Sequence, residues 1–138
     1  YHGGGHREIT RQPRIFAFDT GLVAHVKGWR TIREDDRGHL WENLVLDELR
    51  AAMPSGAMYY WRDKNQNEID FVIDRGDGVV DALEAKITPD ALNTRALRAF
   101  RSSYSRGTNY LLCPFADKPY KIQKGEYAIR VCVPRQLK

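Results

Sequence analysis

The chain has 138 residues, of which 42% are hydrophobic and 29% charged, so it fits one ordinary globular domain and not a disordered chain. Its formal charge of +4 permits nucleic-acid binding without requiring it. No run of about eighteen apolar residues occurs, so we expect no membrane association. Cys113 and Cys132 lie in predicted strands without zinc-site spacing. We therefore expect two reduced core thiols in a cytoplasmic protein, with a disulfide or redox role as the alternative.

Residues 1–37 are predicted to be a basic lead-in with a short strand at 15–18 and a brief helix that ends at Gly28. Its second part, 29–37, is polar and charged, which favours a loop. Because the chain begins with Tyr1 and not Met, we expect this lead-in to be the linker from an N-terminal domain. The second unit would then be 38–138.

The best helix of the sequence is predicted over 38–53, where Pro54 and Gly56 follow its last turn. Its core-facing residues recur at helical spacing. They are Trp41, Leu44, Val45, Leu49 and Ala52.

Glu42 stands out in this helix because it shares a stripe with Leu46, Leu49 and Met53. A carboxylate at the margin of an apolar stripe loses hydration unless a partner compensates for it. Two interpretations stay open. Glu42 interacts with the dipole of the first helical turn, or it points at a cation shared with Asp70 and Glu84.

A run of strands is predicted next, with an aromatic-rich strand at 58–62 and a tight polar turn at 63–67. The aromatic side chains could stack on bases, although packing on the sheet is the commoner role of such residues. They are Tyr59, Tyr60 and Trp61.

Acidic side chains alternate with apolar ones over 67–74, and the same alternation follows at 83–87. If residues 76–78 turn the chain back, the two strands pair and Asp70 shares a face with Glu84 and Lys86. Two neighbouring carboxylates repel each other and need a cation or a proton between them. This spacing fits a site for a hard metal ion that acts on phosphodiesters, with a plain surface ion-pair network as the alternative.

The next helix is predicted to start at Pro89 and to run to about Tyr104. Its polar face would carry Arg95, Arg98 and Arg101, either as a solvated basic face or as one that contacts nucleic-acid phosphates. Strands follow at 109–113, 120–122 and 127–133, and 134–138 is predicted to be a tail. The order of helix, three strands, helix and strand indicates a mixed α/β domain whose central sheet is flanked by helices.

The chain contains the segments FDTGL at 18–22, GHLWENLV at 38–45, YWR at 60–62, NEIDF at 67–71 and EAK at 84–86. In order and spacing, these resemble the C-terminal domain, of unknown function, of prokaryotic AAA-type ATPases. With Glu42 and Asp70, the EAK segment also resembles the PD-(D/E)XK nuclease superfamily. That resemblance implies a restriction-endonuclease-like αβββαβ core. Ile69 stands where the superfamily signature has proline, which leaves the acid in place.

The resemblance also implies roles for individual residues. Asp70 and Glu84 would bind Mg²⁺ or Mn²⁺, with the carbonyl of Ala85 as a possible third ligand. Lys86 would orient the attacking water, and Glu42 would hold a metal-bound water or a second ion.

The expected function is therefore that of a metal-dependent nuclease-like domain in a larger AAA-type ATPase. Its expected partners are nucleic acid, DNA more than RNA, and the N-terminal ATPase domain, with a homodimer as a possibility. ATP would bind outside this chain, because no Walker-type phosphate loop occurs in it. The alternative is a non-catalytic module that binds nucleic acid or protein for that ATPase.

Overall fold

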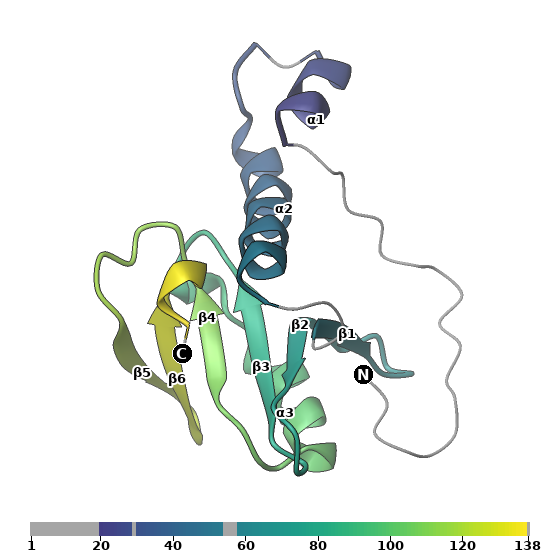
Figure 1. The fold of residues 1–138 in the computed structure, drawn as a ribbon, viewed down its shortest axis with the longest axis vertical. Helices are drawn as coiled ribbons and strands as arrows, with labels where there is room; N and C mark the ends of the chain where they lie inside the picture. Colours follow the sequence, from purple (N-terminus) through teal and green to yellow (C-terminus); the bar gives the residue numbers. More distant parts are fainter. Residues whose placement is uncertain (1–19, 29, 54–57, 138) are drawn as a thin grey trace.

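The computed structural model describes residues 20–28, 30–53 and 58–137. They form a mixed α/β fold in which one sheet is covered by helices (Figure 1). The α-helices are α1 (Thr20–Val26), α2 (Glu34–Ala52) and α3 (Thr94–Ser103). None of them, in these described segments, is long and apolar enough to cross a membrane. The strand predicted at 15–18 lies outside the described residues.

Six strands make up the sheet of the described chain, and their spatial order is β1-β2-β3-β4-β6-β5. They are β1 (Met58–Arg62), β2 (Glu68–Asp74), β3 (Val80–Ala85), β4 (Asn109–Leu112), β5 (Tyr120–Lys124) and β6 (Tyr127–Cys132). The pairs β3–β4 and β4–β6 are parallel, and the other three pairs are antiparallel. The predicted order of helix, three strands, helix and strand is confirmed.

The hairpin of β2 and β3 fixes the faces of its side chains. Gly76, Asp77 and Gly78 all have positive φ, which lets the chain reverse within a few residues. Phe71 pairs with Leu83 in the register of this hairpin. Asp70 comes one residue before Phe71, and Glu84 comes one residue after Leu83. These two acids therefore stand opposite each other on the other face of the hairpin. The predicted turn at 76–78 and the pairing of these strands are confirmed.

The sheet carries an apolar layer on each face. Residues of α2 pack on one face with the β2 and β3 side chains Phe71, Ile73, Leu83 and Ala85. Residues of α3 pack on the other face, where the rings of Trp61 and Phe100 meet edge to face at 5.4 Å between centroids. Asp70 and Glu84 point to the α3 side, because they alternate with Phe71 and Leu83.

The N-terminal boundary of α2 differs from the prediction. The helix begins at Glu34, so the predicted loop over 29–37 is wrong in its second half. Three acids, Glu34, Asp35 and Asp36, form the first turn, where the helix dipole favours negative charge. A segment that is polar on all sides of the helix shows no hydrophobic periodicity, which explains why the first turn of α2 was not predicted. Glu42 lies well inside the helix, so the first-turn interpretation of this residue is wrong.

The second half of the chain departs from prediction at two boundaries. Pro89 starts a short 3₁₀ turn, Pro89–Ala91, and α3 begins only at Thr94. Asn93 caps α3, with its side-chain oxygen accepting a hydrogen bond from the backbone N–H of Arg95 at 2.9 Å. The predicted tail is partly wrong as well, because Pro134–Gln136 forms a 3₁₀ turn that packs against α2.

Candidate functional site

Two carboxylates and one lysine meet where β2 and β3 lie side by side. The Nζ of Lys86 lies 2.8 Å from Oδ2 of Asp70 and 2.9 Å from Oε2 of Glu84. The backbone N–H of Ala85 also donates to Oδ2 of Asp70, at 3.0 Å. Asp70 is therefore held from two directions, and both acids face one cationic atom.

These acids are buried, whereas the lysine reaches the surface. Asp70 is 5% exposed and Glu84 is 7% exposed, while 27% of the Lys86 side chain is accessible. Burial, and then the negative charge of Asp70, raise the pKa of Glu84 to about 8. For Lys86, burial lowers the pKa, but Glu84 and Asp70 together outweigh it and raise the pKa above its ordinary value. The two carboxylates of the cluster thus carry more negative charge than one lysine neutralises, and a proton on Glu84 compensates for part of this charge.

A pocket of about 380 Å³ opens onto this cluster. Its lining includes Glu84 and Lys86, together with Asn93 and Arg95 from the start of α3. A ligand that enters this pocket therefore meets the cationic side chains of Lys86 and Arg95 as well as Glu84. An anionic group such as a phosphate would be attracted by Lys86 and Arg95.

The donor set suits a hard divalent cation. One oxygen from each of Asp70 and Glu84 lies within 3 Å of the same atom, so one cation can reach both acids. In the described part of the chain, no group of three or more His, Cys, Asp or Glu side chains lies close enough to hold a metal. Mg²⁺ does not need such a group, since it commonly binds one or two carboxylates and completes its shell with water and phosphate oxygens.

Glu42 lies on α2, the helix that covers the face of the sheet opposite to α3. It is half-buried on α2, and the neighbouring Trp41 donates from Nε1 to the carbonyl of Leu112 at 2.8 Å. The same carbonyl accepts from the backbone N–H of Lys86 at 3.1 Å. This turn of α2 is therefore anchored at the ends of β3 and β4, beside the backbone of Lys86.

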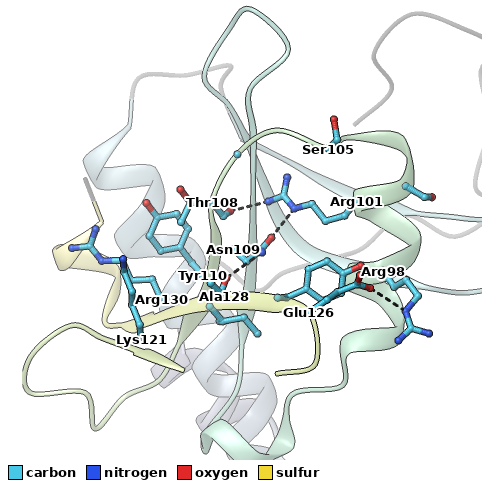
Figure 2. Close-up of a pocket in the computed structure, with 14 residues that line it drawn as sticks. Arg98, Arg101, Ser105, Thr108, Asn109, Tyr110, Lys121, Glu126, Ala128 and Arg130 are labelled. Carbon is cyan, nitrogen blue, oxygen red and sulfur yellow. Dashed lines mark hydrogen bonds and ion pairs between the residues drawn. The ribbon is translucent and has the colours of Figure 1, made fainter. Parts of the chain in front are cut away.

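The three arginines predicted on a common face of α3 occupy different environments. Arg95 and Arg98 are exposed, whereas Arg101 is only 9% exposed. An α-helix turns about 100° per residue, so steps of three residues drift, and Arg101 lies about 120° around the axis from Arg95. The guanidinium of Arg101 donates to the carbonyls of Val80 and Thr108 and to the side chain of Asn109, as Figure 2 shows in part. The predicted common exposed face is wrong for Arg101.

Pocket residues that the sequence analysis did not single out come from the turn before β2. Asp63 accepts hydrogen bonds from the backbone and side-chain nitrogens of Asn67 at 2.8 and 2.7 Å. These two hydrogen bonds close the turn. Gln66, whose φ is 62°, lies in this turn and lines the same pocket as Glu84. The turn was predicted from its polar residues, but its position beside the acids follows only from the pairing of β1 with β2.

Comparison with known proteins places the chain in a recognised sequence family. The family described as "Domain of unknown function (DUF4143)" matches residues 37–133. Two uncharacterised proteins, of Mycobacterium tuberculosis and Mycobacterium bovis, are each 30% identical over 93 residues, which cover 64% of this chain and 21% of each relative. The aligned part of the chain thus spans about a fifth of these curated relatives.

A solved structure is also similar. Its title reads "Refined half-complex from tetradecameric assembly of Thermococcus gammatolerans McrB AAA+ hexamers with bound McrC". The matching chain is 16% identical with a TM-score of 0.45, and the match covers 70% of this chain and 27% of that one.

Proposed function

We propose that this domain, which belongs to the DUF4143 family of domains of unknown function, is a metal-dependent nuclease. The proposal rests on the chemistry of its site. The observation that carries the proposal is the convergence of Asp70 and Glu84, on adjacent strands, around the Nζ of Lys86. Phosphodiester hydrolysis needs a Lewis acid, a positioned water and neutralisation of charge on the phosphate. Side chains suited to each of these tasks line or adjoin one pocket.

Each residue takes a distinct role in the proposal. Asp70 and Glu84 would hold Mg²⁺ or Mn²⁺, which would supply Lewis-acid chemistry for phosphodiester hydrolysis. The backbone N–H of Ala85 keeps Asp70 oriented, and the carbonyl of Ala85 is a candidate further ligand. Lys86 orients the attacking water and attracts the phosphate, and Arg95, which lines the same pocket, also attracts the phosphate. Glu42 would hold a water bound to the metal or a second ion.

The finer fold and the larger assembly belong to the same proposal. The αβββαβ order, with β3 parallel to β4, supports a restriction-endonuclease-like core. The segments FDTGL and GHLWENLV support a place in the C-terminal part of an AAA-type ATPase. The length of the curated relatives leaves room for such a protein, since the aligned part covers about a fifth of them.

A cleavage assay tests the proposal. The protein is incubated with labelled single-stranded, duplex and branched DNA and with RNA, in Mg²⁺, in Mn²⁺ and in EDTA. We expect cleavage that requires the metal and falls to background in Asp70→Asn, because an amide cannot replace the negative charge. Asp77→Asn is the matched control, since Asp77 is exposed at the opposite end of the hairpin. Failure of the folded wild type to cut any substrate would reject the nuclease and favour a binding module.

A further inference from the structure

Carboxamide side chains are frequent in the lining of the 380 Å³ pocket to which Glu84 and Lys86 belong. Three of them come from the turn between β1 and β2, and the fourth comes from the residue that caps α3. We call these four residues the amide wall. They are Asn65, Gln66, Asn67 and Asn93. A carboxamide carries a donor and an acceptor, whereas the cationic groups of lysine and arginine only donate. The amide wall therefore suits a ligand that also presents a donor and an acceptor.

Hydrogen bonds hold the amide wall in place and leave part of each amide for a ligand. The side-chain oxygen of Asn93 accepts from the backbone N–H of Arg95 at 2.9 Å, so its amide nitrogen is left to donate. Asn67 donates from Nδ2 to Oδ2 of Asp63 at 2.7 Å, so its side-chain oxygen is left to accept. Gln66 is tied to the carbonyl of Asp63 by its backbone N–H, at 3.3 Å. Its side-chain amide keeps both functions.

The backbone of Gln66 has a conformation that residues other than glycine rarely adopt. Its φ is 62°, in the left-handed region where a Cβ is disfavoured. The hydrogen bonds that Asp63 makes with Gln66 and Asn67 impose this conformation on the turn. Such strain is found at ligand sites, where the surrounding structure fixes a side chain in a required position. Glycine would fit the turn without strain, so the strain indicates a use for the glutamine side chain.

The turn and the start of α3 form one surface. Burial raises the pKa of Asp63, but its hydrogen bonds with Asn67 and the charge of Arg95 help to outweigh burial and lower the pKa below its ordinary value. Asp63 therefore stays ionised at neutral pH and keeps the turn closed. Because the turn does not have to fold around a ligand, binding to the amide wall loses little entropy.

We propose that the amide wall binds an adenine base of the nucleotide next to the scissile phosphate, an inference that rests on the proposed function. Lys86 lines the same pocket as the amide wall, so a strand whose phosphate reaches Lys86 brings a neighbouring nucleotide to the wall. A phosphate offers acceptors only, whereas the edge of a base offers donors as well. Adenine is the base that the amide of Gln66 fits best, because the amide accepts from the 6-amino group and donates to a ring nitrogen beside it.

The test measures equilibrium binding of fluorescent DNA hexamers, in EDTA so that no metal-dependent cleavage occurs. Each hexamer contains a single kind of base, so that every register presents the same base to the site. The bases are adenine, thymine, cytosine, hypoxanthine, which keeps the O6 and N7 acceptors of guanine, and purine, which is adenine without its 6-amino group. We expect the adenine hexamer to bind about tenfold more tightly than the others, because a bidentate amide–adenine pair discriminates between bases by about this factor.

Two variants test the role of the glutamine. Gln66→Gly removes the side chain, and glycine adopts a φ of 62° without strain, so the turn keeps its shape. We expect this variant to bind the adenine hexamer about tenfold more weakly than the wild type does, with unchanged affinity for the thymine hexamer. Gln123→Ala is the control, since Gln123 is an exposed glutamine of β5 outside this pocket, and it should keep the full preference.

Three results would overturn the proposal. They are equal affinity of the wild type for all hexamers, an adenine preference that survives in Gln66→Gly, and tightest binding of the hypoxanthine hexamer. The last result would assign the base contact to Arg95, because arginine reads the O6 and N7 acceptors. The two proposals fail separately, since the preference is measured without metal. Adenine-specific binding with no hydrolysis would reject the nuclease alone, and hydrolysis without a base preference would reject the amide wall alone.

Discussion

The ammonium group of Lys86 lies at the two acids to which a metal would bind. Its ammonium touches both acids, so Lys86→Ala leaves two buried carboxylates without their cation. We expect the metal-free variant to lose about 2 kcal/mol of unfolding free energy at pH 8. This is less than the 3–5 kcal/mol typical of a fully buried pair, since Lys86 is partly exposed and Glu84 can take up a proton.

Metal should reverse that loss. Because the removed charge repels a metal, Mg²⁺ or Mn²⁺ should raise the melting temperature of Lys86→Ala more than that of the wild type, while cleavage is lost. Thermal unfolding with and without metal measures this, with the exposed Lys118→Ala as control. An equal metal effect in wild type and Lys86→Ala would show that the lysine does not compete for the site.

Glu84 should make the stability of the metal-free domain depend on pH. Its pKa is about 8 in the folded state against an ordinary value of 4.5, so between these values the folded state binds the extra proton. Stability then falls as pH rises through this window, by up to about 1.4 kcal/mol per unit. Lys86, whose pKa is raised, keeps its contribution throughout the window and loses it only above its ordinary pKa.

Glu84→Gln should remove this contribution because an amide does not titrate. We expect the unfolding free energy of wild type minus variant to decrease steadily from pH 5 to pH 8 in EDTA, as measured by urea denaturation. A difference that is constant with pH would mean that Glu84 is ionised in the folded protein at pH 5.

At the scale of elements, the close approach of the α3–β4 loop to β3 is the most demanding local feature. Gly107 has a φ of 129°, and a Cβ there would lie 2.1 Å from the carbonyl oxygen of Val80. Gly107→Ala must therefore displace the loop that Arg101 holds, and we expect a loss of about 3 kcal/mol or more. Gly125→Ala is the control, since its φ of 61° is also left-handed but its surroundings are open.

The Gly125→Ala control should cost about 1–2 kcal/mol, from backbone strain alone. Urea denaturation of both variants measures the difference. Equal losses would mean that the loop relaxes without cost and that its approach to Val80 does not determine stability.

The elements that the sequence predicts best are those with a clear hydrophobic period. The alternation of apolar residues with acids predicts β2 and the face shared by Phe71 and Ile73, whereas Ile69 packs on the α3 side of the sheet against that prediction. The predicted meeting of Asp70, Glu84 and Lys86 follows from the pairing of β2 with β3. Local sequence patterns do not predict features that depend on packing between segments far apart in the chain. Nothing near Pro134 in the sequence shows that it packs against α2, and the burial of Arg101 depends on carbonyls of a loop and of β3.

For the whole molecule, the two apolar layers join α2, the sheet and α3 into one cooperative unit, whereas α1 packs only lightly, mainly against α2. No residue of α1 is buried, and Leu22 and Val26 are exposed on it. It lies beyond the N-terminal end of α2, away from the sheet (Figure 1). The boundary of the family match at residue 37 also leaves α1 outside the shared region. Loss of α1 structure should therefore leave the sheet intact.

Amide hydrogen exchange tests this separation in the intact chain. Opening free energies range from near zero for weakly packed segments to the global value for the core. We expect the amides of α1 to exchange within seconds at neutral pH, while those of Val72, Leu83 and Leu111, which are buried in β2, β3 and β4, exchange only through global unfolding. Mass spectrometry of peptides from both regions, followed over urea concentrations below the unfolding transition, resolves the two classes. Protection of α1 equal to that of the central strands would show that the helix belongs to the same cooperative unit.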